Sequence, residues 1–147
     1  MSSNQAKSRF VRVFTNGCFD IIHSGHVKLL EFARQQGDEL IVGVNSDYSV
    51  RRLKGCGRPI MSCEDRVAVL EAIRWVDRVY VFDDPTPEGL ICELRPQVLV
   101  KGPEAAKTEI PGADWVLANG GRVIVPDWPV EISTTMIARR CKAVCNA

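Results

Sequence analysis

The chain has 147 residues, of which 46% are hydrophobic and 25% are charged, and its formal net charge at pH 7 is +1. This length is typical of one domain with a sizeable core. Because the charges nearly cancel, no general attraction to nucleic acid or to an anionic membrane is expected. No apolar run approaches the roughly 18 residues that a membrane span needs. We therefore expect no nucleic-acid partner, no membrane partner and a cytoplasmic location.

Residues 1–9 lack the apolar core of a signal peptide, so they are predicted to be a flexible tail before a single domain at 10–147. The six cysteines include no C-x-x-C pair and form no regular framework, which favours reduced cytosolic thiols. Cys141 and Cys145 are four residues apart, but no further histidine is present to complete a zinc site with them. We expect no protein-bound metal there.

Short β-prone runs alternate with amphipathic segments along the chain. Strands are expected at 10–14, 39–44, 78–82, 98–101 and 122–125. Helices are expected from 27 onward, over 67–75, from 87 to 94, over 113–119 and from 134 to about 143. Ser62 with Asp65 indicates a capping box, Thr86 before Pro87 indicates an N-cap, and Ser133 indicates the cap of the last helix.

This alternation predicts an α/β fold: a Rossmann-like three-layer sandwich with a five-stranded parallel sheet covered on both faces. Ligands of such sheets bind beyond the carboxyl ends of the strands. The loop after the first strand, the region of Asn45, the stretch after Lys101 and the segment 132–135 are expected to meet at that edge.

The stretch 15–26, TNGCFDIIHSGH, joins the first strand to the first helix. It contains His23 and His26, the only two histidines of the chain, three residues apart at the helix start. Free N–H groups and the positive end of the helix dipole favour an anion there, and two imidazoles suit a phosphate. The residues therefore indicate a phosphate site, with packed histidines or a zinc site with Cys18 and Asp20 as the alternatives.

This stretch resembles the HxGH-type nucleotidyltransferases, which are cytidylyltransferase-like. Further motifs of that family occur in the same order: LIVGVNSD (40–47), RRLKGCGRPI (51–60), CEDR (63–66), LRPQVLVKG (94–102) and ISTT (132–135). The resemblance covers roughly 10–140 and is closest to the D-glycero-D-manno-heptose 1-phosphate adenylyltransferases of ADP-heptose synthesis. It implies the HxGH nucleotidyltransferase fold.

The resemblance implies transfer of a nucleoside monophosphate from ATP to a heptose 1-phosphate, with release of pyrophosphate. The implied catalytic residues are His23, His26 and Lys54. The implied nucleotide-binding residues are Thr15, Asn16, Cys18, Phe19, His23, Gly25, His26, Ser133, Thr134 and Thr135. The implied substrate-binding residues are Asp20, Lys54, Arg66 and Lys101. Mg²⁺ is expected through the triphosphate oxygens, and family members are usually homodimers.

Several of these residues have a second interpretation. Lys54, among glycines, could remain a solvated surface charge, and Ser133 could act only as an N-cap. Arg66 could form a salt bridge to Glu64 or Asp65, and Asp20 could orient its loop instead of approaching the acceptor. Cys18 is expected to act through its backbone and not as a catalytic thiol.

Two departures from the family pattern bear on the substrate. After LVKG the heptose enzymes usually continue with glycine, aspartate and an aromatic residue, whereas this chain has Pro103-Glu104-Ala105. Cytidylyltransferases carry an arginine shortly before ISTT, whereas here the run is WPVE (128–131), which counts against glycerol-3-phosphate cytidylyltransferase. The alternatives are a CTP-dependent enzyme acting on glycerol 3-phosphate or another phosphorylated alcohol, and a non-catalytic nucleotide-binding regulator.

Overall fold

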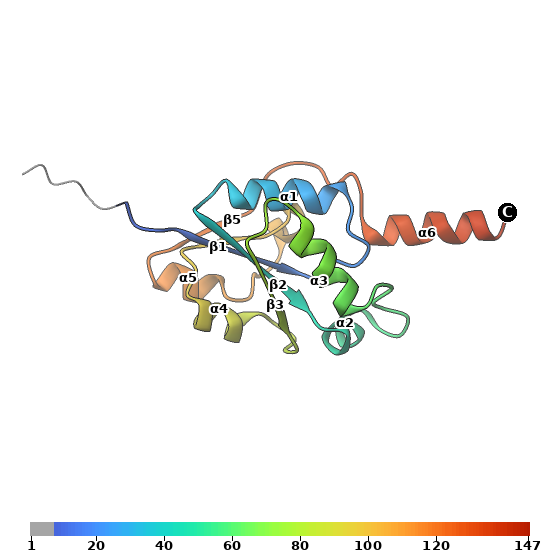
Figure 1. The fold of residues 1–147 in the computed structure, drawn as a ribbon, viewed down its shortest axis with the longest axis horizontal. Coiled ribbons are helices and arrows are strands. Elements are labelled where there is room, and N and C mark those ends of the chain that lie inside the picture. Colours follow the sequence, from blue (N-terminus) through green and yellow to red (C-terminus); the bar gives the residue numbers. More distant parts are fainter. Residues whose placement is uncertain (1–7) are drawn as a thin grey trace, which may run out of the picture.

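The computed structural model describes residues 8–147, so most of the predicted tail at 1–9 lies outside the described residues. One parallel sheet has the strand order β3-β2-β1-β4-β5 (Figure 1). Its strands are β1 (Arg12–Gly17), β2 (Glu39–Asn45), β3 (Arg78–Phe82), β4 (Val98–Val100) and β5 (Arg122–Ile124). The helices are α1 (Ser24–Arg34), α2 (Asp47–Lys54), α3 (Cys63–Ala72), α4 (Glu88–Leu94), the 3₁₀ helix η1 (Pro103–Lys107), α5 (Ala113–Ala118) and α6 (Thr134–Cys145).

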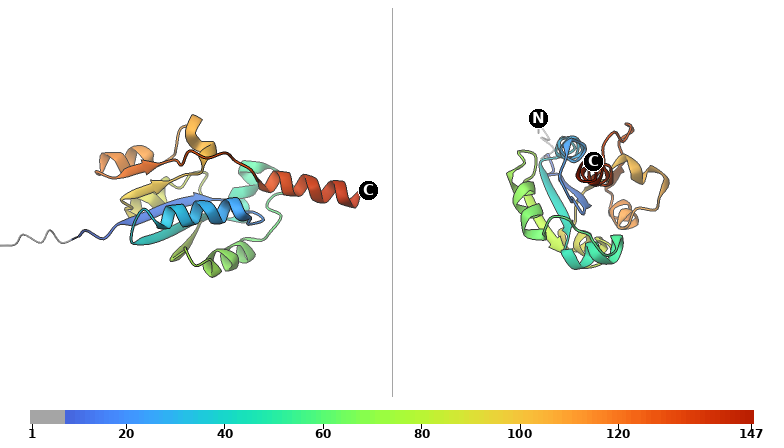
Figure 2. Two further views of the ribbon diagram at one scale, coloured as in Figure 1. Left: turned by 90° about the horizontal axis from the view of Figure 1, so that it is seen from above. Right: turned by 90° about the vertical axis from the view of Figure 1, so that its right-hand side faces the viewer.

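Helices cover both faces of the sheet (Figure 2). One apolar cluster lies on each face, beneath these helices. Successive strand side chains point to opposite faces, so Val13 belongs to one cluster and Phe14 to the other. The Val13 cluster includes Leu30 of α1 and Leu70 of α3, and the Phe14 cluster includes Ile91 of α4. The predicted three-layer α/β sandwich with five parallel strands is confirmed.

The strand order places the site at the centre of the sheet. The chain builds outward from β1 through β2 to β3, then returns to the other side of β1 as β4 and continues to β5. The direction of winding therefore reverses between β1 and β4. In open α/β sheets a crevice forms beyond the carboxyl ends of the strands at such a switch point.

The first strand lies later in the chain than predicted. It runs from Arg12 to Gly17 because it pairs with β2 along its whole length, from Arg12↔Glu39 to Gly17↔Val44. Backbone pairing thus draws the polar residues Thr15 and Asn16 into the strand, where the sequence pattern had placed them in a loop.

The helix α2 was not predicted from the sequence, where Lys54, among glycines, resembles a lysine of a flexible loop. Its N-cap is Ser46, whose side chain accepts a hydrogen bond from the Ser49 backbone N–H, and it ends at Gly55, whose φ is 90°. Glycine adopts this left-handed conformation at no steric cost. Lys54 is therefore the last residue of a helix and not part of a mobile loop.

Other helix boundaries differ in detail. Ser62 does cap α3, but the helix ends at Ala72 because Ile73 is extended. Thr86 is not an N-cap, since α4 begins at Glu88 after Pro87 and has no side-chain cap. In Figure 1, α6 projects away from the sheet. Within residues 8–147 the structure contains no helix of the length and apolarity required to cross a membrane.

Candidate active site

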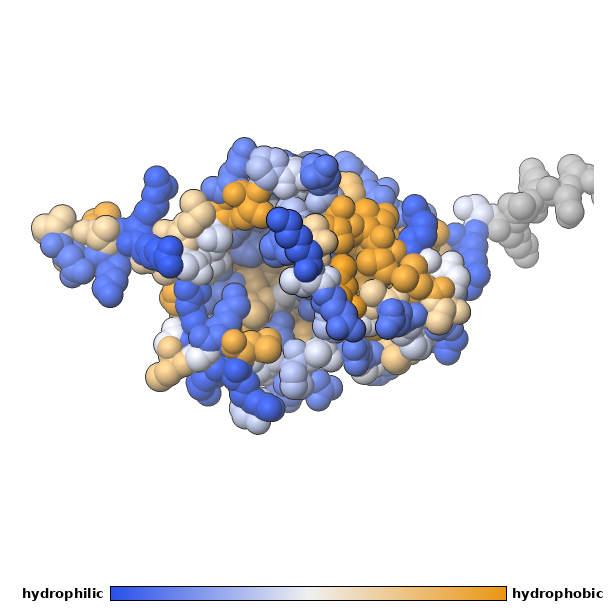
Figure 3. Space-filling model, turned by 180° about the vertical axis from the view of Figure 1, so that it is seen from behind, coloured by the Kyte–Doolittle hydropathy of each residue, from blue (hydrophilic) through white to orange (hydrophobic). Residues whose placement is uncertain are grey.

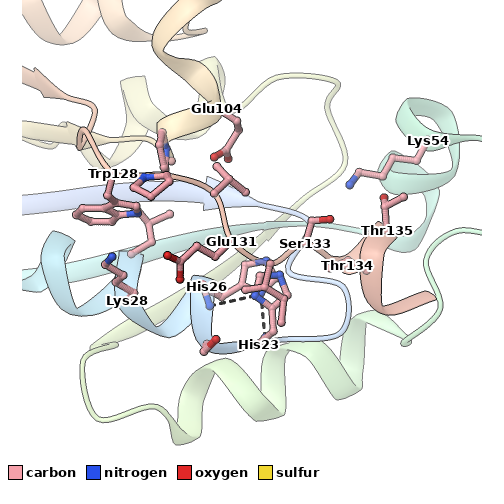
Figure 4. Close-up of a pocket in the computed structure, with 18 residues that line it drawn as sticks. His23, His26, Lys28, Lys54, Glu104, Trp128, Glu131, Ser133, Thr134 and Thr135 are labelled. Carbon is pink, nitrogen blue, oxygen red and sulfur yellow. Dashed lines mark hydrogen bonds between the residues drawn. The ribbon is translucent and has the colours of Figure 1, made fainter. Parts of the chain in front are cut away.

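A cleft of about 540 Å³ lies beyond the carboxyl end of β1, between the start of α1, the end of α2, η1 and the segment leading into α6. From behind, the surface is hollowed near the base of α6 (Figure 3). Of the predicted site residues, those lining the cleft are His23, Gly25, His26, Lys54, Ser133, Thr134 and Thr135. They come from three segments far apart in sequence, and Figure 4 shows them around one space.

His23 and His26 form a capping box at the start of α1. His23 is the N-cap residue, and its Nδ1 accepts a hydrogen bond from Gly25 N at 3.1 Å. His26 Nδ1 accepts one from His23 N at 3.2 Å, and the two rings stack with centroids 3.9 Å apart (Figure 4). Because each Nδ1 is an acceptor, a neutral ring carries its hydrogen on Nε2. The backbone therefore fixes both imidazoles as Nε2–H donors.

The surroundings of these rings keep them neutral. Burial, together with nearby His23 and Lys54, lowers the pKa of His26 to about 4, and Asp20 acts in the opposite direction. Burial also lowers the pKa of His23 below its ordinary value. At neutral pH the pair therefore offers hydrogen-bond donors to an anion without a full positive charge.

These shifts predict how stability depends on pH. Between the ordinary histidine pKa of 6.5 and about 4, the unfolded chain binds a proton at His26 that the folded chain does not. The free energy of unfolding should therefore fall as the pH is lowered through this window. Urea unfolding at pH 7, 5.5 and 4.5 measures this free energy. The His26→Gln variant is the comparison, because other groups also titrate in this pH range. If the free energy of unfolding falls with pH by the same amount in both proteins, the prediction is contradicted.

Packing around the first turn of α1 requires glycine at position 25. A Cβ at this position would lie 2.9 Å from Cε1 of His23 and 3.2 Å from Cγ2 of Ile132. Real Cβ atoms essentially never approach a neighbour as closely as the first distance. The absence of a side chain at Gly25 thus lets the His23 ring fold back over the first turn of α1.

The loop between β1 and α1 is strained. Phe19 and Ile21 both have φ values of 50°, in the left-handed region, although neither is glycine. For a β-branched residue such as Ile21 this conformation is a genuine outlier, and such strain persists only where surrounding contacts hold it. Phe19 is buried, and its ring packs against His26 with centroids 5.3 Å apart.

Lys54 and the start of α6 contribute donors across the cleft from the histidines (Figure 4). The Ser133 side chain caps α6 by accepting a hydrogen bond from the Met136 N–H. The Thr134 hydroxyl donates to the main-chain oxygen of Asp20, so it is used inside the protein. Thr135 also lines the cleft, so the N-terminus of α6 lies at the cleft, and the N-terminus of a helix suits phosphate.

Four predicted nucleotide-binding residues are not among the residues that line the cleft. Thr15 is completely buried, and its Oγ1 has no hydrogen-bond partner among the described residues. Burial raises the pKa of the Cys18 thiol, which agrees with a residue that is not a thiolate nucleophile. The other two are Asn16 and Phe19. Their contacts with a nucleotide stay predictions.

Lys101 does not line the cleft either. Its Nζ donates to both the backbone oxygen and the side-chain oxygen of Asn16, each at 3.1 Å. Burial lowers its pKa, while nearby Glu104 opposes that change. Lys101 therefore fixes the end of β1 in this structure, and its predicted contact with substrate is not tested by it.

Asp20 and Arg66, both predicted to bind substrate, are likewise buried and absent from the cleft lining. The Asp20 carboxylate accepts hydrogen bonds from the backbone N–H groups of Ile60 and Met61. The Arg66 guanidinium forms an ion pair with Asp47 at 2.8 Å, and not with Glu64 or Asp65. In this structure, both side chains therefore contact protein groups and do not face the cleft.

The cleft wall also contains residues that were not among the predicted site residues. Lys28 and Trp128 both line it, and Lys28 Nζ lies 4.5 Å from the centre of the Trp128 ring, a cation–π distance. Phe32 meets the same ring edge-on. Glu104 and Glu131 add two carboxylates. Their positions in the sequence could have indicated these residues, because Lys28 follows HSGH on the same helix and Trp128 and Glu131 precede ISTT.

The alternative zinc site at the histidine pair lacks a converging set of ligands. Across residues 8–147, no group of three or more His, Cys, Asp or Glu side chains is arranged to hold a metal ion. The Asp20 carboxylate is directed at Ile60 and Met61, and Cys18 Sγ lies 4.0 Å from the Asn45 side-chain oxygen.

Comparison with known proteins identifies the family of this chain. The Cytidylyltransferase-like family model matches residues 14–140. The chain is 52% identical to the Bifunctional protein HldE of Alcanivorax borkumensis over 88% of its own length and 27% of that protein. It is 53% identical to the Bifunctional protein HldE of Pseudomonas aeruginosa over 88% of its length and 28% of that protein. The chain thus spans little more than a quarter of the length of these curated relatives.

Solved structures give the same fold. A lipopolysaccharide core biosynthesis protein from Thermoplasma volcanium is 25% identical with a TM-score of 0.69, over 82% of this chain and 100% of that one. A protein of unknown function from Archaeoglobus fulgidus has a TM-score of 0.64 at 21% identity, over 84% of this chain and 94% of that one. With the histidine pair, the ISTT helix start and the family match in agreement, this chain belongs to the cytidylyltransferase-like family of nucleotidyltransferases.

Proposed function

We propose that this enzyme transfers AMP from ATP to a heptose 1-phosphate, D-glycero-D-manno-heptose 1-phosphate, giving ADP-heptose and pyrophosphate. The observation that carries the phosphate chemistry is the pair of fixed Nε2–H donors of His23 and His26 across a cleft from Lys54 and the start of α6. The heptose acceptor is supported by the motif resemblance and by the identity to the HldE proteins.

The reaction needs positioning and charge stabilisation more than proton transfer. A phosphate oxygen of the acceptor attacks the α-phosphorus, the new P–O bond forms, and the bond to the bridging oxygen of pyrophosphate breaks. Negative charge develops on the phosphoryl oxygens and the leaving group. The Nε2–H groups of His23 and His26 would donate to these oxygens, and Lys54 would neutralise charge on the phosphates.

Mg²⁺ is part of this proposal, because magnesium typically binds with triphosphate oxygens, several waters and few protein ligands. It would offset phosphate charge. Hard oxygen donors suit this ion, and the carboxylates on the cleft wall, Glu104 and Glu131, fit that requirement. The homodimer, the cytoplasmic location and the absence of nucleic-acid and membrane partners stay predictions.

The test is pyrophosphate release with Mg²⁺, crossing ATP and CTP against a panel of acceptors. The panel holds heptose 1-phosphates of both anomers, other sugar 1-phosphates and glycerol 3-phosphate. Turnover with ATP and one heptose 1-phosphate is expected. Turnover only with CTP, or with none of the heptoses, would contradict the proposed substrates. The absence of release with every pair would favour a nucleotide-binding regulator.

A further inference from the structure

The segment 47–61, which carries Lys54, is held at its start by the buried side chain of Arg66 and at its end by the buried side chains of Arg66 and Asp20. At its start, Arg66 forms the 2.8 Å ion pair with Asp47, the first residue of α2. At its end, Arg66 Nε donates to Met61 O at 3.1 Å, and the Asp20 carboxylate accepts from Ile60 N at 2.8 Å and Met61 N at 2.9 Å.

The Arg66 side chain also holds the strained loop after β1, of which Asp20 is a part. Arg66 NH1 donates to Cys18 O at 2.6 Å and to Asn45 O at 2.7 Å, so it ties the ends of β1 and β2 together. The main-chain oxygen of Asp20 accepts from the Thr134 hydroxyl at the start of α6. Three segments that face the cleft thus converge on Asp20 and Arg66.

Neither side chain is available to a substrate. Arg66 is completely buried and directs four N–H donors at protein oxygens, and Asp20 is only 2% exposed. Arg58 NH1, which is itself buried, lies 3.7 Å from Asp20 Oδ2 and closes off the carboxylate further. Substrate contact would require breaking these buried interactions.

We propose that Asp20 and Arg66 are positioning residues, which fix Lys54 relative to the histidine pair and the start of α6 instead of binding the acceptor. This inference rests on the phosphate role proposed above for Lys54. A charge that must meet a phosphate in the transition state loses most of its effect when its carrier segment shifts by about 1 Å. The clamp formed by Asp20 and Arg66 restricts such shifts at both ends of the segment.

The test is a double-mutant cycle with Asp20→Asn and Lys54→Ala, measured as kcat and KM for pyrophosphate release. An amide retains one acceptor oxygen but presents its NH₂ to a backbone N–H, so one end of the clamp is lost. Asp20→Asn is expected to lower kcat on the order of a hundredfold. In the Lys54→Ala background the same change should lower kcat by less than about threefold, because residues acting as one unit are not additive.

Glu39→Gln is the matched control. Glu39 is a buried carboxylate that pairs with Arg12 and Arg78, each at 2.9 Å, but it lies at the amino end of β2, away from the cleft. It should cost stability without changing kcat in either background. Hydrogen exchange of peptides covering 55–62 should accelerate in Asp20→Asn and not in Glu39→Gln.

The outcomes separate this inference from the proposed function. An equal loss of kcat from Asp20→Asn in both backgrounds would overturn the inference while leaving the role of Lys54 intact. Full activity of Lys54→Ala alone would contradict the role of Lys54 and the inference with it. If Asp20→Asn does not fold, Arg66→Lys enters the same cycle with the same expected result, since an ammonium keeps the charge but cannot reach all four oxygens.

Discussion

Replacement of His26 by alanine is expected to lower kcat by about a hundredfold or more, the usual cost of losing one preorganised transition-state donor. The effect should appear in kcat more than in KM, because the donor matters most when charge develops on the phosphoryl oxygens. His26 is already neutral at pH 7, with its pKa lowered to about 4, so its removal takes away a directed N–H and not a net charge.

Alanine at position 26 also removes the acceptor for the His23 N–H, so some stability is lost as well. Gln36→Ala is the control, because it deletes a side-chain hydrogen bond to Phe32 O at the other end of the same helix. Steady-state kinetics and thermal unfolding of both variants separate the two effects. Near-normal turnover of His26→Ala would contradict a phosphate role for this histidine.

The sequence predicted the fold class because the signals were local and repeated. Strand and helix patterns alternate along the chain, and caps such as Ser133 and Ser62 lie where the sequence indicated them. Boundaries set by partners were not predictable in this way. The shift of β1 depends on its pairing with β2. The helix before Gly55 is only eight residues long and mostly polar, so its few apolar residues were not enough to distinguish it from a loop.

The same distinction between local and tertiary signals holds for the candidate site. Residues within the HSGH and ISTT motifs, such as His23, His26 and Thr135, do line the cleft. Asp20 and Arg66 were assigned to substrate binding because of their motifs, with orientation of the loop as the alternative for Asp20, and the structure shows both side chains buried against backbone groups. Which side chains face the cleft depends on tertiary packing, and one sequence does not specify that.

Replacement of Arg66 by methionine is expected to lower the free energy of unfolding by about 3 kcal/mol, a large effect for one residue. Methionine fills much of the same volume, so the loss comes from hydrogen bonds more than from a cavity. The oxygens of Cys18, Asn45 and Met61 would lose their charged donor. The strained loop after β1 would lose one of the contacts that hold it.

Urea unfolding at pH 7 measures this loss, with Arg78→Met as the control. Arg78 also pairs with a carboxylate, Glu39 at 2.9 Å, but its side chain is 57% exposed, so solvent screens the pair and the same substitution there should change stability far less. Because Arg66 directs its donors at three backbone oxygens, the change should also accelerate hydrogen exchange in the loop 18–22 and near 61. Equal losses for the two variants would mean that burial and the backbone contacts of Arg66 add nothing to an ordinary ion pair, and the clamp would then have no energetic basis.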